Sequence, residues 1–87
     1  MFVSDRWRTF SQRDQIGHIG AELLRAGNAG DNADLRRALL ERALDLIDAS
    51  LDDPKWRANP LPMLTLRGEV AKAYVGATDP AKIYATL

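Results

Sequence analysis

The stretch that decides the fold is Ala33–Leu51, which reads ADLRRALLERALDLIDASL. At the helical period of about 100° per residue, its apolar residues form two adjacent lines that together cover roughly half of the helix circumference. A helix that faces a single neighbour needs a narrower apolar stripe. This helix is therefore predicted to pack against at least two others. The first line is Leu40, Leu44, Ile47 and Leu51, and the second is Leu35, Leu39, Ala43 and Leu46.

The opposite side of the same helix is acidic. Carboxylate oxygens there could bind a divalent cation or a basic partner. The spacing lacks the tight loop that wraps a calcium ion, so we interpret the side chains as a solvated face partly paired with arginines. The acidic ridge consists of Glu41, Asp45, Asp48 and Asp52, at i, i+4, i+7 and i+11, and Asp53 extends it.

Capping signals predict one long helix on each side of this stretch. Ser11, with Asp14 three residues later, forms a capping box that starts a helix over residues 12–26. Gly27 follows as a residue that can turn left-handed and end the helix. Asn59 and Pro60 have the N-cap and first-turn preferences that start a third helix, over residues 60–75.

Shorter elements are predicted in the remaining segments. Asp53 and Pro54 mark a single short turn, and Thr78 or Asp79 with Pro80 begins a short C-terminal helix. Matched helix lengths and short connections favour antiparallel packing, and no segment alternates as a strand does. We predict one all-α domain over residues 1–87, a small antiparallel bundle of three main helices plus the short C-terminal helix. Its core is expected to include Leu23, Leu39, Leu46, Ile47 and Val70, with Ile16, Ile19, Leu23 and Leu24 as the inward face of the first helix.

Composition excludes several classes of protein. The 87 residues are 46% hydrophobic and 28% charged, as is typical of a globular domain. The chain has no cysteine, so disulfides and thiolate metal sites are excluded. The net charge of the chain is zero, whereas nucleic-acid binders usually carry an excess of basic residues. No apolar run is long enough to span a membrane. We expect a cytoplasmic protein that binds neither nucleic acid nor membrane, and nine arginines to three lysines suggest a bacterial source.

One line of polar residues on the first helix suggests chemistry. Asp14, His18 and Glu22 lie one turn apart, and carboxylates beside a histidine can orient the ring as a metal ligand or general base. The six residues from Arg13 to His18 also resemble the Arg-x4-His signature of the HEPN ribonucleases. That resemblance implies a four-helix bundle that often dimerises and cleaves RNA with Arg13 and His18. The alternative interpretation is a solvated surface with local charge pairs.

Two arginines and three aromatic residues interrupt these patterns. Arg36 and Arg67 lie among apolar residues, so each is expected to reach a carboxylate, a helix carbonyl or the edge of the bundle, or else to bind an anion. The expected carboxylates are Asp5, Asp53 and Glu69. The large aromatic residues outside the main helices are expected to close the ends of the bundle, because an aromatic ring buries a large area. They are Trp7, Phe10 and Trp56.

The sequence therefore favours association over catalysis. Three helices with this much apolar surface would leave part of it uncovered in a monomer, and such surfaces usually mark interfaces. We expect a homodimer or an adaptor for another protein, with no cofactor and no metal. The alternative is a HEPN-like ribonuclease or a metal-dependent enzyme that uses Arg13, Asp14, His18 and Glu22. The candidate interaction surface is Leu40, Leu44, Ile47, Leu51, Met63, Tyr74, Ile83 and Tyr84.

Overall fold

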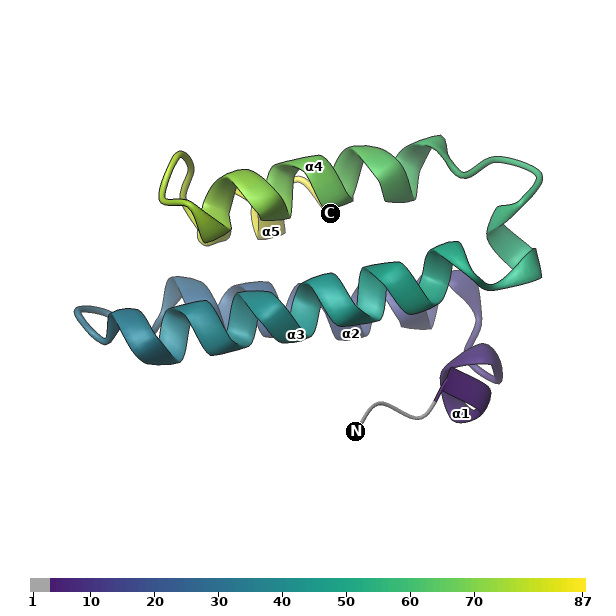
Figure 1. The fold of residues 1–87 in the computed structure, drawn as a ribbon, viewed down its shortest axis with the longest axis horizontal. Coiled ribbons are helices and arrows are strands. Elements are labelled where there is room, and N and C mark those ends of the chain that lie inside the picture. The colour runs from purple at the N-terminus through teal and green to yellow at the C-terminus, as the bar shows by residue number, and fades with distance from the viewer. Residues whose placement is uncertain (1–3) are drawn as a thin grey trace.

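The computed structural model describes residues 4–87, which form five α-helices, one short 3-10 turn and no strand (Figure 1). The predicted all-α fold is confirmed. Helices α2 (Gln12–Gly27) and α3 (Ala33–Leu51) form an antiparallel pair, and α4 (Leu61–Tyr74) runs back along α3. The short helix α5 (Pro80–Ala85) then returns between α2 and α4.

Capping side chains set where α2, α3 and α5 begin, whereas α4 follows Pro60 without a side-chain cap, so the predicted N-cap role of Asn59 is wrong. The hydroxyl of Ser11 accepts a hydrogen bond from the backbone N–H of Asp14, as the capping box predicts. The side chain of Asn32 caps α3 by accepting a hydrogen bond from the N–H of Leu35. Asp79 caps α5 in the same way, through the N–H of Ala81. The helix boundaries therefore lie within one or two residues of those predicted.

Helix α5 packs closely on α2 at Gly27, which lies inside α2 without a positive φ and so is not the left-handed residue that was expected to end this helix. A Cβ atom at Gly27 would lie 3.1 Å from the Cβ of Ala81 and 3.2 Å from its backbone nitrogen. Further along α2, Gly20 lies against the side chains of Tyr84 and Leu87. Helix α5 therefore covers the part of α2 from Gly27 back to Gly20.

The core lies between α2, α3 and α4. The burial of the five residues predicted for the core shows how far that prediction holds. Leu23, Ile47 and Val70 are fully buried and Leu39 is buried, as predicted. Leu46 is only partly buried, so that prediction is wrong. The buried hydrophobic residues in the described range are Trp7, Ile19, Leu23, Ala26, Leu39, Leu40, Ala43, Ile47, Trp56, Met63, Leu66, Val70, Ala73 and Ile83.

Helix α2 is rotated relative to the predicted orientation. Leu24 is 40% exposed and Ile16 is partly buried, whereas the polar residues Gln15 and Glu22 are buried. Burial of a polar side chain is tolerated when its hydrogen bonds are made inside the protein. Gln15 meets this condition, and its partners at the end of the bundle explain the rotation.

A buried hydrogen-bond network closes that end of the bundle. The side-chain amide of Gln15 donates to the carbonyl of Trp7 and to Asp53 Oδ2, and its oxygen accepts from Trp56 Nε1 at 2.7 Å. The indole of Trp7 donates to Ser50 Oγ at 2.9 Å. These bonds attach α1 (Ser4–Arg8) and the 3-10 turn η1 (Pro54–Trp56) to the long helices. The prediction that aromatic residues close the bundle end is therefore confirmed.

Candidate functional site

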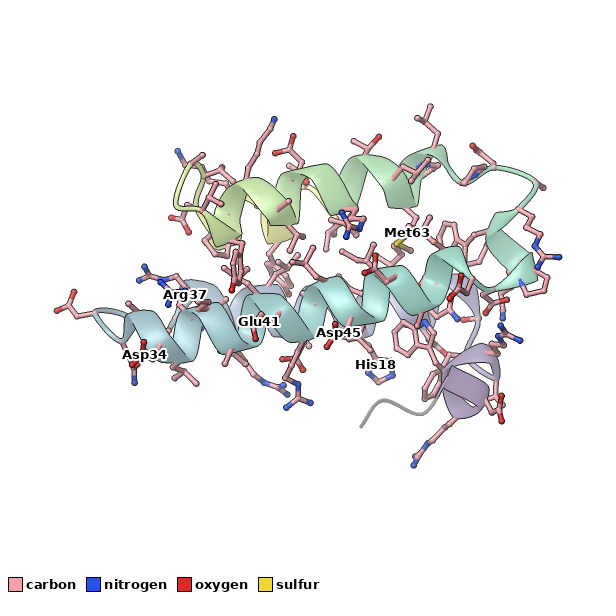
Figure 2. The ribbon with its side chains drawn as sticks, viewed as in Figure 1. His18, Asp34, Arg37, Glu41, Asp45 and Met63 are labelled. Atoms are coloured by element: carbon pink, nitrogen blue, oxygen red, sulfur yellow. The ribbon has the colours of Figure 1, made fainter. Side chains whose placement is uncertain are left out.

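The four residues of the predicted catalytic cluster do not converge. The ring of His18 lies against Phe10, with centroids 4.7 Å apart, and 5.8 Å from Trp7 (Figure 2). Arg13 and Asp14 are exposed on the first turn of α2. Between residues 4 and 87, no hydrogen bond or ion pair joins Arg13, Asp14, His18 and Glu22 to one another, and no three His, Cys, Asp or Glu side chains are grouped to hold a metal ion.

Glu22 is the member of this cluster whose environment differs most from the prediction. Its side chain is only 7% exposed and lies between two arginines rather than in solvent. Glu22 Oε1 is 2.9 Å from Arg25 Nη1 and 3.8 Å from Arg42 Nη2, whereas Oε2 has no hydrogen-bond partner in the described chain. The carboxylate therefore joins α2 to α3 through Arg42.

The acidic ridge is divided between three environments. Tyr74 of α4 donates a hydrogen bond to Glu41 Oε1 at 2.7 Å, and Arg67 of α4 pairs with Asp48 at 2.7 Å. Asp45 and Asp52 are exposed, whereas Asp53 is buried in the bundle-end network. Two members of the ridge, Glu41 and Asp48, thus attach α3 to α4, and Asp45 and Asp52 remain a solvated face as predicted.

Of the two arginines that interrupt apolar surfaces, Arg67 reaches a carboxylate but not one of the expected residues, whereas Arg36 reaches a loop carbonyl rather than a carboxylate or a helix C-terminal carbonyl. Arg67 pairs with Asp48 instead of Asp5, Asp53 or Glu69, and both members of the pair are about half exposed. Arg36 donates to the carbonyl of Gly30 in the loop before α3. The partners were missed because the relative rotation of α3 and α4 decides which acid faces Arg67.

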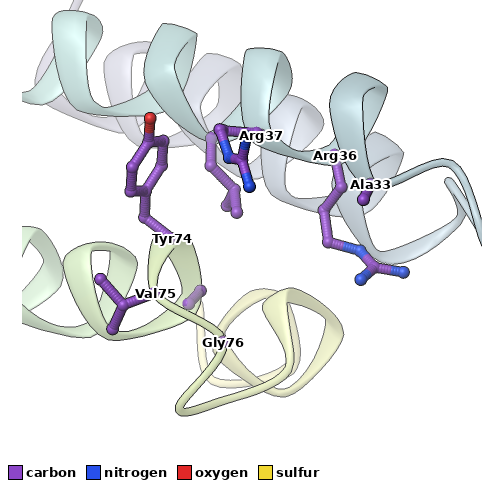
Figure 3. A pocket seen from close by; sticks show the side chains of 8 residues that line it. Ala33, Arg36, Arg37, Tyr74, Val75 and Gly76 are labelled. Carbon is purple, nitrogen blue, oxygen red and sulfur yellow. The ribbon is translucent and has the colours of Figure 1, made fainter.

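Arg36 also lines a hollow of about 560 Å³ between the N-terminal end of α3 and the C-terminal end of α4 (Figure 3). Arg36 and Arg37 are the charged residues of its lining, and Arg37 makes no salt bridge within residues 4–87. An anion is therefore the group that this hollow could accept. A smaller hollow of about 420 Å³ shares Arg36 and adds the acidic residue Asp79.

Tyr74 forms the inner wall of the larger hollow, and its hydroxyl points toward α3. The hydrogen bond to the Glu41 carboxylate raises the pKa of Tyr74, because it stabilises the neutral phenol beside a negative charge. Burial acts in the same direction, and Arg37 partly opposes both. Tyr74 is therefore a neutral hydrogen-bond donor that fixes α4 to α3.

Most of the candidate interaction surface lies inside this single chain. Leu40, Ile47, Met63 and Ile83 are at most 5% exposed, and Figure 2 shows Met63 between α4 and α3. Leu44, Leu51 and Tyr74 are partly buried, which leaves Tyr84, at 42%, as the exposed member of the set. Helices α3 and α4 use these residues to cover each other, so an interface must be sought elsewhere.

The outer side of α4 carries Leu61, Leu64 and Val75, the largest group of exposed apolar side chains along a single helix of the described chain. Met63, Leu66, Val70 and Ala73 recur at i, i+3, i+7 and i+10, are buried, and form what we call the inner seam. A second set recurs at i, i+3, i+7, i+10 and i+14, which is the a/d spacing of a coiled coil. The two sets lie on nearly opposite sides of the helix at about 100° per residue. This outer seam consists of Leu61, Leu64, Gly68, Ala71 and Val75.

Four of the five residues of the outer seam are exposed in the described chain, and Ala71 is partly buried. Leu61 is 66% exposed, Leu64 48% and Val75 77%. Nothing lies within 4 Å of the position that a Cβ atom of Gly68 would take. A glycine inside a helix costs about 1 kcal/mol relative to alanine, and packing within this chain gives no reason for one there.

No protein-family model, curated protein or solved structure matches this chain. None of the helices formed by residues 4–87 has the length and apolarity needed to cross a membrane. The outer seam is the feature that sequence reasoning missed. The signal for it was the second a/d repeat in residues 61–75, which overlaps the repeat of the core residues.

Proposed function

We propose that this protein acts by self-association, as a homodimer that forms through the outer seam of α4. The observation that supports the proposal is an a/d repeat along α4 whose large members, Leu61, Leu64 and Val75, are 66%, 48% and 77% exposed. A coiled-coil repeat of this kind normally faces another helix. In contrast, the residues of the catalytic alternative, Arg13, Asp14, His18 and Glu22, do not share a cleft.

The exposed area is sufficient for a weak dimer. Complete burial of a leucine or valine contributes about 1.5–3 kcal/mol. The exposed parts of Leu61, Leu64 and Val75 amount to nearly two whole side chains per copy, hence about 6–11 kcal/mol for a dimer. Association itself costs roughly 4–15 kcal/mol. The dissociation constant is therefore expected to be micromolar or weaker, since a one-helix interface is also smaller than the roughly 800 Å² per partner of stable complexes.

Sedimentation equilibrium from micromolar to millimolar protein tests the proposal. The wild-type chain should pass from its mass of 9.7 kDa to twice that value as the concentration rises. Leu64→Glu should remain monomeric, because it places a charge in the middle of the seam. The matched control is Leu35→Glu, since Leu35 is a leucine of similar exposure, 46%, on α3.

Two results would contradict the proposal. A wild-type chain that stays at 9.7 kDa up to millimolar concentration would remove self-association and leave the adaptor role, in which another protein covers the seam. A dimer that is weakened equally by Leu64→Glu and Leu35→Glu would show that α4 is not the interface. Circular dichroism should confirm that both variants keep the helical fold.

We also propose a bacterial, cytoplasmic setting for this dimer. The absence of cysteine and the excess of arginine over lysine support it. Fractionation of source cells, with the protein found in the periplasmic or membrane fraction, would contradict it.

A further inference from the structure

We propose that the two copies pair with their α4 helices antiparallel and cross at Gly68, an inference that rests on the proposed dimer. Gly68 lies at the centre of the outer seam, seven residues after Leu61 and seven before Val75. Leu64 and Ala71 are placed almost symmetrically on either side of it. A two-fold axis through Gly68 therefore superimposes one half of the seam on the other half of the second copy.

The sizes of the side chains favour this direction over the parallel one. In an antiparallel pair, Leu61 faces Val75 of the second copy and Leu64 faces its Ala71, so each large side chain meets an equal or smaller one. In a parallel pair, like residues face each other. Leu64 would then meet Leu64 and Ala71 would meet Ala71, so bulky contacts and gaps would alternate along the seam, whereas Gly68 meets Gly68 in either direction. Close packing requires large and small residues to alternate across an interface.

Gly68 permits the close approach that the crossing requires. With no Cβ atom, the helix backbones can come nearer to each other at this point than at any other residue of the seam. The space beside Gly68 is open, so the second copy would not displace any part of the described chain. Gly17 of α2 is equally open but does not lie on the seam, which makes it a natural control.

Electrostatics also favour the antiparallel arrangement. The N-terminal end of each α4, which carries partial positive charge, lies beside the negative C-terminal end of the other. Lys72 is the charged residue nearest to the seam, and the two copies of Lys72 would be eight residues, or about 12 Å, apart along the helix axis. Arg67 is turned toward α3, where Asp48 neutralises it. No like charges therefore face each other closely.

Cysteine crosslinking distinguishes the two directions, and the chain offers a clean background because it has no cysteine of its own. A mixture of Leu64→Cys and Ala71→Cys should form a disulfide-linked heterodimer under mild oxidation, because these positions face each other in the antiparallel pair. Leu61→Cys alone should not crosslink, because its two copies would be about 21 Å apart along the axis, whereas a disulfide needs Cα atoms within about 7 Å. A mixture of Leu61→Cys and Val75→Cys should give the mixed dimer.

The glycine itself is tested by Gly68→Ala, measured by sedimentation equilibrium. The two added methyl groups should weaken the dimer at least tenfold in Kd, whereas Gly17→Ala should leave the Kd unchanged. Both alanine variants should raise the urea midpoint of the monomer at low concentration, because both favour the helix. A misfolded variant would show a lower urea midpoint instead of a higher one.

Each outcome has one meaning. Crosslinks between Leu64 and Ala71 and between Leu61 and Val75, together with the tenfold loss for Gly68→Ala, support the antiparallel pair. A dimer in which Leu61→Cys crosslinks to itself overturns the antiparallel arrangement but leaves self-association intact, as does a dimer that Gly68→Ala does not weaken. A chain that is monomeric at all concentrations overturns both.

Discussion

Replacement of Gln15 by methionine should destabilise the fold by about 2–4 kcal/mol. Methionine keeps the length of the side chain, so no large cavity forms, but three buried hydrogen bonds are lost. Trp56 Nε1 is then left without an acceptor in a buried position, and a stranded buried group costs about 1–3 kcal/mol. Asp53 also loses one of its donors. A domain of 87 residues has a total stability of roughly 4–13 kcal/mol, so the change is a large fraction.

Urea denaturation followed by tryptophan fluorescence measures this loss directly, because Trp7 and Trp56 both contact Gln15. With a slope near 1 kcal/mol per molar urea, the midpoint should fall by about 2–4 M. The control is Gln12→Met, which removes an exposed hydrogen bond to the carbonyl of Lys55 and should cost below about 0.5 kcal/mol. Equal midpoints for the two variants would refute the idea that the buried network holds the bundle end.

Three further predictions concern Asp53, Leu40 and the ion pair between Arg67 and Asp48. Burial raises the pKa of Asp53, but hydrogen bonds from Lys55 and Gln15 outweigh this effect and lower the pKa from 3.8 to about 2. The ionised carboxylate should therefore contribute about 2 kcal/mol to the free energy of unfolding above pH 4, and this contribution should be lost as the pH falls from 4 to 2. Asp53→Asn should flatten that dependence in urea titrations at each pH. Leu40→Ala should cost about 2–5 kcal/mol in the same assay, since Leu40 is 1% exposed. Arg67→Met should shift the midpoint no more than the removal of its partner charge by Asp48→Asn, because the pair is exposed.

The helices were predictable because their signals are local. Ser11 and Asp79 cap their helices through backbone groups two or three residues away, and Gly76 has a φ of 82° where α4 ends. Such interactions depend on sequence neighbours alone, so they can be recognised before the fold is known. The apolar repeat of residues 33–51 predicted burial on two sides for the same reason.

The side chains of α2 were less predictable because their partners are distant in sequence. Gln15 is buried through bonds to Asp53 and Trp56, 38 and 41 residues away. A polar residue in isolation indicates an exposed position, and only the assembled bundle end reverses that expectation. The same holds for Glu22, whose second arginine, Arg42, is contributed by α3.

Half of the candidate interaction surface is buried within the chain for a different reason. The apolar residues of α4 are too many to be buried on one face, as the sequence indicates. Apolar character alone does not tell which of the two repeats faces the core. Met63 and Val70 of α4 are buried in the core. Arg67 and Tyr74 stabilise this orientation, because both hydrogen-bond to carboxylates of α3. Once these two polar contacts fix the rotation of α4, Leu61 and Leu64 must point outward. The residues that fasten α4 to its own chain thus also determine which surface it offers to a second one.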